Sequence, residues 1–172
     1  MMVFAQNPTL GLVYCDQTIV LPDGNQKTSK KELINENLLQ KLLEFWTAPN
    51  TSTLMFKKSV FENMGGFNED MSSCQDHDLW MRIALYGISV DVVHEALSFF
   101  HIGDSERISN NLKERMRGVN TFLNIWKNVI IDHKGKLFFK NFSNQYKLKA
   151  AFPIFARAFR EKKIIQCFDA VR

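Results

Sequence analysis

Two carboxylates near the middle of the chain have the placement best suited to chemistry. Asp76 and Asp78 belong to the run Gln-Asp-His-Asp-Leu-Trp at 75–80, where an acid-rich loop gives way to helical spacing. Carboxylates at a helix start lie beside free backbone N–H groups and the positive end of the helix dipole. Such a group stays ionised, and beside a cleft it accepts a proton from a substrate hydroxyl. Asp76 is therefore the leading candidate for a general base.

A structural role is the competing interpretation of both acids. Ser73 and Asp76 have the spacing of a capping box, in which Asp76 would only cap the helix. Asp78 lies two residues on and points elsewhere around the helix, as a structural or solvated carboxylate would. Because acids are common at helix starts, spacing alone favours the structural interpretation.

The residues around these acids resemble a known family. Ser59–Phe61, Gly65–Glu69 and Gln75–Arg82 are similar to the second half of the family 2 glycosyltransferases, which have the GT-A fold. The resemblance covers roughly residues 7–109. It implies inverting transfer of a sugar from a nucleotide-sugar donor to a glycan or other hydroxyl acceptor, as in the synthesis of bacterial surface polysaccharides. Asp76 matches the general base of that family.

The resemblance also implies which residues border the acceptor. It places the polar loop Asn50, Thr51 and Ser52 beside the acceptor, although such residues suit any turn. Gln75 stands where many members have Glu. Trp80 suits either the core or stacking on a pyranose face. The implied substrate-binding residues are Asn50, Thr51, Ser52, Gln75, Asp78 and Trp80.

A divalent metal ion, Mg²⁺ or Mn²⁺, is implied by the same resemblance. Family members hold it on the donor diphosphate with an Asp-x-Asp-like motif, and this chain contains no such motif. His101 ends an expected strand and is the candidate metal or diphosphate contact. The family often has Arg two residues before this His, where this chain has Phe99. A hydrogen-bonded loop histidine is the alternative.

We expect the chain to be the acceptor side of a glycosyltransferase, without the strand and turn that hold the nucleotide. Met1 would fall inside the helix that follows the metal motif, so we expect no measurable transfer without a donor-binding half. An incomplete sheet with an open edge is expected to self-associate or be covered. The alternatives are a non-catalytic module that binds a glycan or a partner protein, with a membrane-surface tail; a membrane-surface adaptor in which the tail dominates; and a truncated product without a function of its own.

Hydrophobic periodicity predicts an α/β fold, a partial GT-A-like mixed sheet with flanking helices, followed by a helical C-terminal region. We place the boundary between domains 1–109 and 110–172. Beyond residue 110, one long amphipathic helix is predicted up to Gly135, then two helical pieces separated at Pro153. The expected strands are 10–14, 53–56, 88–93 and 96–100; the expected helices of the first domain follow Ser29, up to Trp46, and span 58–64 and 75–86, with a turn at 21–25.

The C-terminal segment is strongly basic. Residues 134–172 contain ten Lys and Arg against two acids, whereas residues 1–133 contain twelve against sixteen. Basic residues alternating with Phe suit a helix that lies on an anionic membrane surface. The alternative is that the Phe face packs on the α/β body while the charges are solvated. No nucleic-acid motif accompanies the charge, so we expect no nucleic-acid partner.

A cytoplasmic location, at or near the inner membrane surface, fits the remaining features. The first residues do not have a basic region followed by an apolar run, and no apolar stretch approaches the ~20 residues of a membrane helix. Cys15, Cys74 and Cys167 are odd in number and widely spaced. They therefore read as reduced thiols rather than as a metal or disulfide framework.

Overall fold

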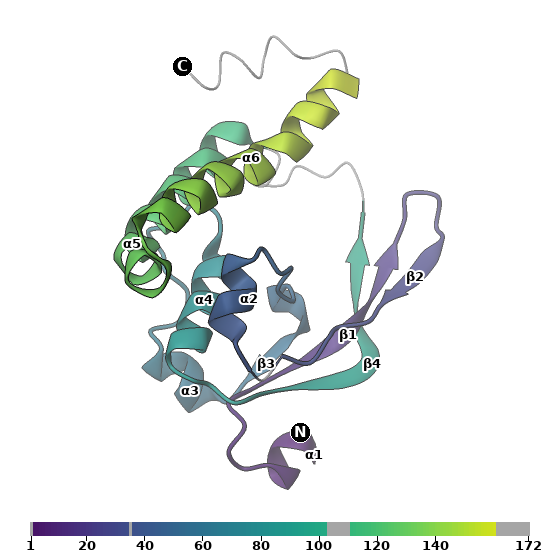
Figure 1. Ribbon diagram of the computed structural model, residues 1–172. Helices are drawn as coiled ribbons and strands as arrows, with labels where there is room; N and C mark the ends of the chain where they lie inside the picture. Colours follow the sequence, from purple (N-terminus) through teal and green to yellow (C-terminus); the bar gives the residue numbers. More distant parts are fainter. Residues whose placement is uncertain (1, 35, 103–110, 161–172) are drawn as a thin grey trace. The chain divides into compact units, whose positions relative to one another are not determined.

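The computed structural model describes residues 2–34, 36–102 and 111–160 (Figure 1). These residues form four strands and six α-helices, so the predicted mixed α/β class is confirmed. The chain divides into two compact units, one of residues 1–67 with 76–105 and one of residues 68–75 with 106–172. The boundary predicted between residues 109 and 110 lies outside the described residues, as does Cys167.

Strand β1 (Leu12–Val20) organises the first unit. It pairs in parallel with β4 (Val90–His101) and antiparallel with both β2 (Gln26–Ser29) and β3 (Leu54–Phe56). The apolar run at 10–14 is buried, as predicted, and the strand continues beyond it. The predicted turn at 21–25 joins β1 to β2, with Gly24 at φ 83°, in the region that glycine adopts readily.

Strand β4 corrects one prediction. Residues 88–100 were expected to form two strands, but the structure has a single strand from Val90 to His101. The register against β1 shifts on both sides of Asp16, where extra β4 residues around His94 are accommodated by bulges. Bulges keep a strand paired while breaking its alternation, which is the signal that sequence reading relies on.

The prediction that a helix begins at Ser29 was wrong about where the helix starts. Ser29 is paired with Gln17 in the sheet, and helix α2 spans only Leu38–Leu43. The Tyr14 hydroxyl donates to the Glu32 carbonyl (2.6 Å) and accepts from the Ile34 N–H (3.3 Å). These bonds hold the backbone before α2 along β1. Burial raises the pKa of Tyr14, so its phenol is held in the protonated form.

Three helices share one hydrophobic core with the sheet. They are α2, α3 (Lys58–Asn63) and α4 (Gln75–Leu85), while α1 (Met2–Gln6) lies at the N-terminal end. The predictions for 58–64 and 75–86 are confirmed, with Gly65 and Gly87 at positive φ directly after the helices. The core residues are Leu12, Tyr14, Met64, Leu79, Trp80, Ile83 and Val90.

The second unit is built on a pair of long helices. Helix α5 (Leu112–Lys134) ends at Gly135, as predicted, and α6 (Lys136–Arg160) follows it. The break predicted at Pro153 is wrong, because α6 runs through this residue. An interior proline removes one backbone hydrogen bond and its ring crowds the carbonyl four residues earlier, which more often kinks a helix than ends it when packing holds the rest of the helix.

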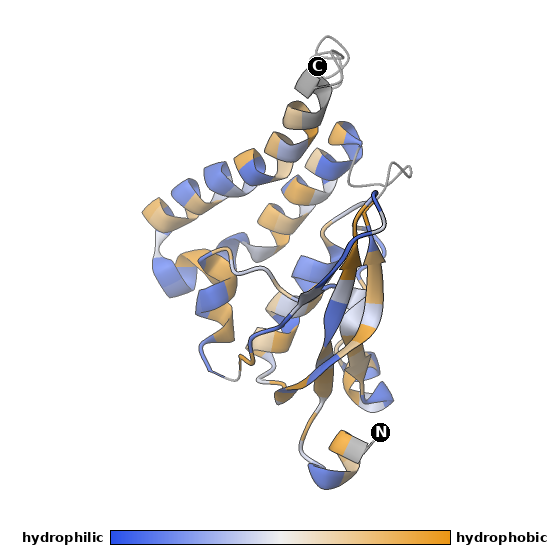
Figure 2. Ribbon diagram, turned by 90° about the vertical axis from the view of Figure 1, so that its right-hand side faces the viewer, coloured by the Kyte–Doolittle hydropathy of each residue, from blue (hydrophilic) through white to orange (hydrophobic). Residues whose placement is uncertain are grey.

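Aromatic side chains hold the two long helices together. Phe122 of α5 and Tyr146 of α6 stack with ring centroids 4.9 Å apart, and Phe142 lies 5.5 Å from Tyr146. Coloured by hydropathy, α5 and α6 show apolar and polar segments in alternation along their length (Figure 2). No helix among the described residues has the length and apolar character needed to cross a bilayer.

Candidate functional site

The two carboxylates of α4 differ sharply in their surroundings. Asp76 is half-buried, and its Oδ1 accepts a hydrogen bond from the neighbouring His77 N–H (2.9 Å). Asp78 is only 2% exposed, and its Oδ2 accepts from two guanidinium nitrogens of Arg82 at 2.8 and 3.0 Å. Arg82 also donates to the Met64 carbonyl and so joins α4 to the end of α3. Asp78 holds the Arg82 guanidinium in the position for this contact. Of the two acids, Asp76 is the one that reaches solvent.

The capping box predicted for α4 does not form. Ser73 was expected to cap the helix reciprocally with Asp76, but its hydroxyl donates to the Arg115 carbonyl (3.1 Å) within the second unit. Gln75 donates to the Met71 carbonyl (2.7 Å) and is therefore engaged in shaping the turn before α4. The competing interpretation of Asp76 as a reciprocal cap with Ser73 is thus removed.

Trp80 has a positioning role. Its side chain is 1% exposed, and its indole N–H donates to the Pro49 carbonyl (2.9 Å). The rings of Tyr14 and Trp46 meet it edge-on, with centroids 6.0 and 5.8 Å away. Trp80 was expected either in the core or stacked on a pyranose ring of the acceptor. The structure places it in the core, where its N–H fixes the start of the polar loop at 50–52.

The polar loop is fixed from its other side by the sheet. Asn50 and Gln17 exchange hydrogen bonds through their amide groups, at 3.3 and 3.2 Å. Gln17, which is buried in β1, also donates to the hydroxyl of Ser98 on β4 (2.9 Å). Thr51 and Ser52 follow in a 3₁₀ turn and are exposed. The loop therefore presents hydroxyls to solvent from a fixed base.

Helix α4 links Asp76 to the polar loop through Trp80. Asp76 lies one helical turn before Trp80, on the same side of α4. Trp80 in turn holds the carbonyl that directly precedes Asn50. We call Asp76 together with Asn50, Thr51 and Ser52 the candidate site. Its half-buried carboxylate is the group that can accept a proton, and the exposed hydroxyls of Thr51 and Ser52 are groups that can bind a polyhydroxyl compound.

Sequence reading missed the buried polar residues behind the candidate site. Asp16 is buried in β1, accepts from the Lys31 N–H (2.6 Å) and lies 3.5 Å from a ring nitrogen of His94. Gln17 and Ser98 complete the support of the loop. One feature of the sequence could have indicated them. The polar pair Asp16-Gln17 directly follows the apolar run that was interpreted as a buried strand.

His101 is not brought to the candidate site. It pairs with Val20 at the end of β4 and lies on the same face of the strand as the exposed Phe99, whereas Ser98 points to the opposite face. Within residues 2–34, 36–102 and 111–160, no three His, Cys, Asp or Glu side chains gather in a group that could hold a metal ion. The described residues thus do not fit Mg²⁺ or Mn²⁺ as a complete ligand set.

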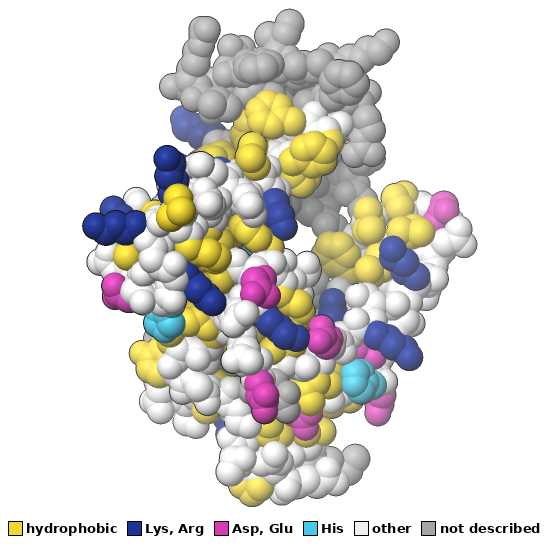
Figure 3. Space-filling view, viewed as in Figure 1, with side chains coloured by type: hydrophobic (Ala, Val, Ile, Leu, Met, Phe, Trp, Pro, Cys, Tyr) yellow, Lys and Arg dark blue, Asp and Glu magenta, His cyan; other side chains and the backbone are white. Residues whose placement is uncertain are grey.

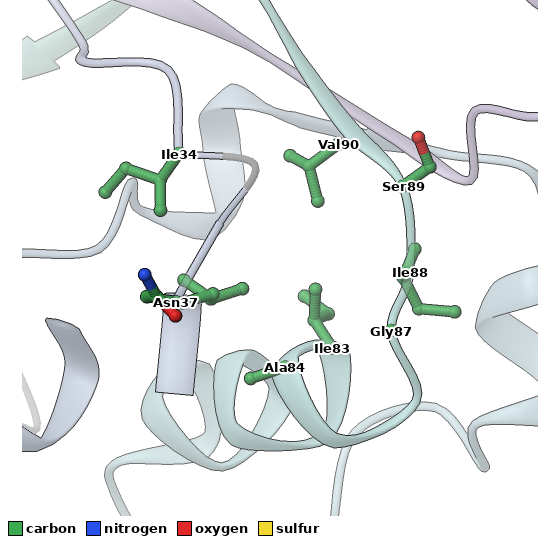
Figure 4. Close-up of a pocket in the computed structure, with 9 residues that line it drawn as sticks. Ile34, Asn37, Ile83, Ala84, Gly87, Ile88, Ser89 and Val90 are labelled. Carbon is green, nitrogen blue, oxygen red and sulfur yellow. The ribbon is translucent and has the colours of Figure 1, made fainter. Parts of the chain in front are cut away.

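A pocket of about 330 Å³ lies at the other end of α4 (Figure 4). Ile83 and Ala84 line it from the helix, Ile34 and Asn37 from the segment before α2, and Val90 from the start of β4. Ile83 is seven residues from Asp76, which is about 10 Å along a helix. The pocket and the candidate site are therefore separate features of the first unit.

Comparison of the chain with models of protein families, with curated proteins and with solved structures finds no match.

Proposed function

We propose that the first unit is the acceptor-binding part of an inverting, nucleotide-sugar-dependent glycosyltransferase with a GT-A-like sheet. The observation that carries the proposal is the position of Asp76, a solvent-reaching carboxylate at the start of α4, one turn before the Trp80 indole that holds the polar loop. The motifs around it, Gly65-Gly66-Phe67-Asn68-Glu69 and Gln75-Asp76, are those that resemble the family 2 enzymes.

In this proposal Asp76 is the general base. As the acceptor oxygen attacks the anomeric carbon, its proton passes to the Asp76 carboxylate, and the bond from that carbon to the diphosphate breaks on the opposite side. The electron pair of the broken bond leaves with the nucleoside diphosphate. Asn50, Thr51 and Ser52 orient the acceptor hydroxyls. The resemblance implies a divalent metal ion on the donor diphosphate, and the described residues contain no complete ligand set for it.

The supporting groups behind the site fit a positioning task. A base must lie within hydrogen-bonding distance of the hydroxyl that it deprotonates, so the loop and the helix must keep their spacing. The Trp80 bond to Pro49 and the amide pair of Gln17 and Asn50 fix the loop to α4 and to β1. In this proposal Trp80 acts through its bond to Pro49, and Asp78 through its ion pair with Arg82, rather than by touching the acceptor, since both are buried.

A non-catalytic glycan-binding module is the second candidate function. The same exposed loop hydroxyls of Thr51 and Ser52 support it, because a saccharide can be bound there without transfer. It predicts binding that is indifferent to nucleotide and metal ion. The two candidates differ in what Asp76 does to a bound acceptor, so the distinguishing variant is Asp76→Asn, which keeps the shape and removes the base.

The test is sugar transfer by the longest product of the gene that encodes this chain. It is incubated with a panel of nucleotide sugars, Mg²⁺ or Mn²⁺, and glycans selected on an array, and products are detected by mass spectrometry. We expect Asp76→Asn to lower kcat by about 10²- to 10⁴-fold with little change in acceptor KM. The exposed acid Asp70 is the matched control, and Asp70→Asn should transfer as the wild type does.

Each outcome decides between the candidates. Transfer by Asp76→Asn at the wild-type rate would contradict the catalytic proposal. Glycan binding without transfer by the wild type, unaffected by nucleotide and metal ion, would favour the binding module. If neither glycan binding nor transfer is found, both candidate functions fail.

A further inference from the structure

The outer face of α6 carries an apolar stripe. Leu137, Leu148 and Phe152 are 73%, 69% and 71% exposed. Leu148 and Phe152 follow Leu137 by 11 and 15 residues, which at 3.6 residues per turn places all three within about 60° around the helix axis. The stripe is about 22 Å long at 1.5 Å per residue. Between Leu137 and Leu148 the same side of the helix also carries the exposed polar residues Asn141 and Asn144, so the neighbouring apolar residues of the stripe are Leu148 and Phe152, and Leu137 lies apart from them.

The inner face of the same helix is already occupied. Phe142 and Tyr146 are buried, and Tyr146 stacks on Phe122 of α5. The alternative considered above had the Phe face of the tail packed on the α/β body, whereas in the structure these residues pack on α5 within the second unit. Because packing on α5 fixes how α6 is turned, the stripe is held outward, on the side of the helix away from α5.

All charged residues of α6 are basic. The helix from Lys136 to Arg160 contains six Lys and Arg and no Asp or Glu. By helical spacing, Lys140 and Lys147 lie along one side of the stripe and Lys149 along the other. Figure 3 shows apolar and Lys or Arg side chains next to one another on the part of the surface that α6 forms. The partner of this face must offer negative charge and an apolar phase together.

We propose that the outer face of α6 binds an anionic lipid bilayer, with the helix lying in the plane of the membrane surface. Leu137, Leu148 and Phe152 enter the boundary between head groups and acyl chains, and the flanking lysines reach lipid phosphates. A bilayer offers both phases along the whole length of the stripe. Nucleic acid matches the positive charge but gives an aligned apolar stripe nothing to be buried in.

The first test is co-sedimentation of the full chain with vesicles. We expect binding to phosphatidylcholine vesicles that contain phosphatidylglycerol, weaker binding in high salt, and no binding to pure phosphatidylcholine. The variant Lys140→Gln/Lys147→Gln changes only exposed side chains of α6. It should lower the partition coefficient by about 30-fold, since each lysine near an anionic surface contributes roughly five-fold.

The second test addresses the apolar stripe. Leu148→Ser/Phe152→Ser should lower partitioning by at least about 10-fold, because the buried hydrocarbon is lost. Ile125→Ser on α5 is the matched control, since Ile125 is also a partly exposed apolar residue of a long helix. Circular dichroism checks that each variant keeps its helical content, and the salt dependence of the wild type needs no variant.

Three results would overturn the proposal. The first is no sedimentation with anionic vesicles. The second is vesicle binding that Leu148→Ser/Phe152→Ser leaves unchanged, which would mean adsorption through charge alone. The third is tighter binding to duplex or single-stranded nucleic acid than to anionic vesicles at the same salt concentration.

Discussion

In the first unit a surface loop is held by buried polar side chains, whereas in the second unit two long helices are held by stacked aromatic rings. The loop at 50–52 is fixed by the Trp80 indole and by the paired amides of Gln17 and Asn50. The helices α5 and α6 are joined through Phe122, Tyr146 and their neighbours. Both arrangements leave part of the surface open to a partner.

The difference lies in what each kind of contact can fix. Hydrogen bonds are directional, so the first unit can hold Asp76 and the loop hydroxyls in a set geometry, as a site for one small acceptor requires. Aromatic and aliphatic packing is less directional, and it fixes only which side of α6 faces outward. Binding to a membrane surface, as proposed for α6, requires only that this side of the helix faces outward. The three predictions below test this contrast.

The largest effect is expected at Asp78. Asp78→Ala leaves the Arg82 guanidinium without its carboxylate in a mostly buried position. Breaking a buried ion pair from one side costs about 3–5 kcal/mol, which we expect to see as a lower free energy of unfolding in urea. Asp76→Ala is the control two residues away, and it should change stability by less than about 1 kcal/mol. Equal losses of unfolding free energy in the two variants would contradict the distinction between Asp78 as a structural carboxylate and Asp76 as one that is free of a structural role.

Gly118 tests the second unit. A Cβ added to this α5 residue would lie 2.1 Å from the Ser73 hydroxyl oxygen and 2.6 Å from the Ser73 carbonyl oxygen. The backbone of Ser73 cannot move away from the added Cβ as easily as a flexible side chain could. Gly118→Ala should therefore destabilise the chain by about 1–3 kcal/mol, despite the better helix propensity of alanine. Asn124→Ala, at an exposed position of α5, is the control. A stabilised Gly118→Ala variant would show that α5 does not approach Ser73 so closely.

A smaller effect with a distinct pH dependence is expected at Tyr14. Its hydroxyl bonds the Glu32 carbonyl and the Ile34 N–H, so Tyr14→Phe should cost about 1–2 kcal/mol at neutral pH. Since burial raises the pKa of Tyr14, its stabilisation is complete below the ordinary value of 10.0 and is lost as pH rises through the raised value.

Urea unfolding at neutral pH and above pH 10 checks this prediction. The wild type should lose more stability than Tyr14→Phe over that interval, while the exposed Tyr86→Phe control follows the wild type. An identical alkaline loss in the wild type and Tyr14→Phe would contradict the assignment.

Much of the fold could be predicted from the sequence where local signals agree with packing. Helices α4 and α5 each combine helical periodicity with a glycine just after the helix, the run at 10–14 is continuously apolar, and the turn at 21–25 contains Pro22 and Gly24. The failures are places where distant contacts prevail. The segment after Ser29 has helical spacing, yet the Lys31 N–H donates to the Asp16 carboxylate and the Tyr14 hydroxyl donates to the Glu32 carbonyl, and these bonds hold the segment along β1.

The candidate site was only partly open to sequence reasoning. Two acids separated by one residue at a helix start look alike in a sequence, and only the Arg82 contact in space distinguishes buried Asp78 from Asp76. The support of the loop by Gln17 and Ser98 joins residues 81 positions apart. Such contacts produce no periodic pattern in the sequence, because the residues become neighbours only when the strands of the sheet pair.

The central claim is that Asp76 and the loop at 50–52 form one saccharide-binding site. The most direct measurement is an NMR titration of the labelled chain with glycans selected on an array, without nucleotide or metal ion. The account predicts that resonances of Asn50, Thr51, Ser52 and Asp76 shift together, and that Asn50→Ala weakens binding. Shifts confined to other residues, such as those of the pocket around Ile83, or no shifts with any glycan, would contradict it.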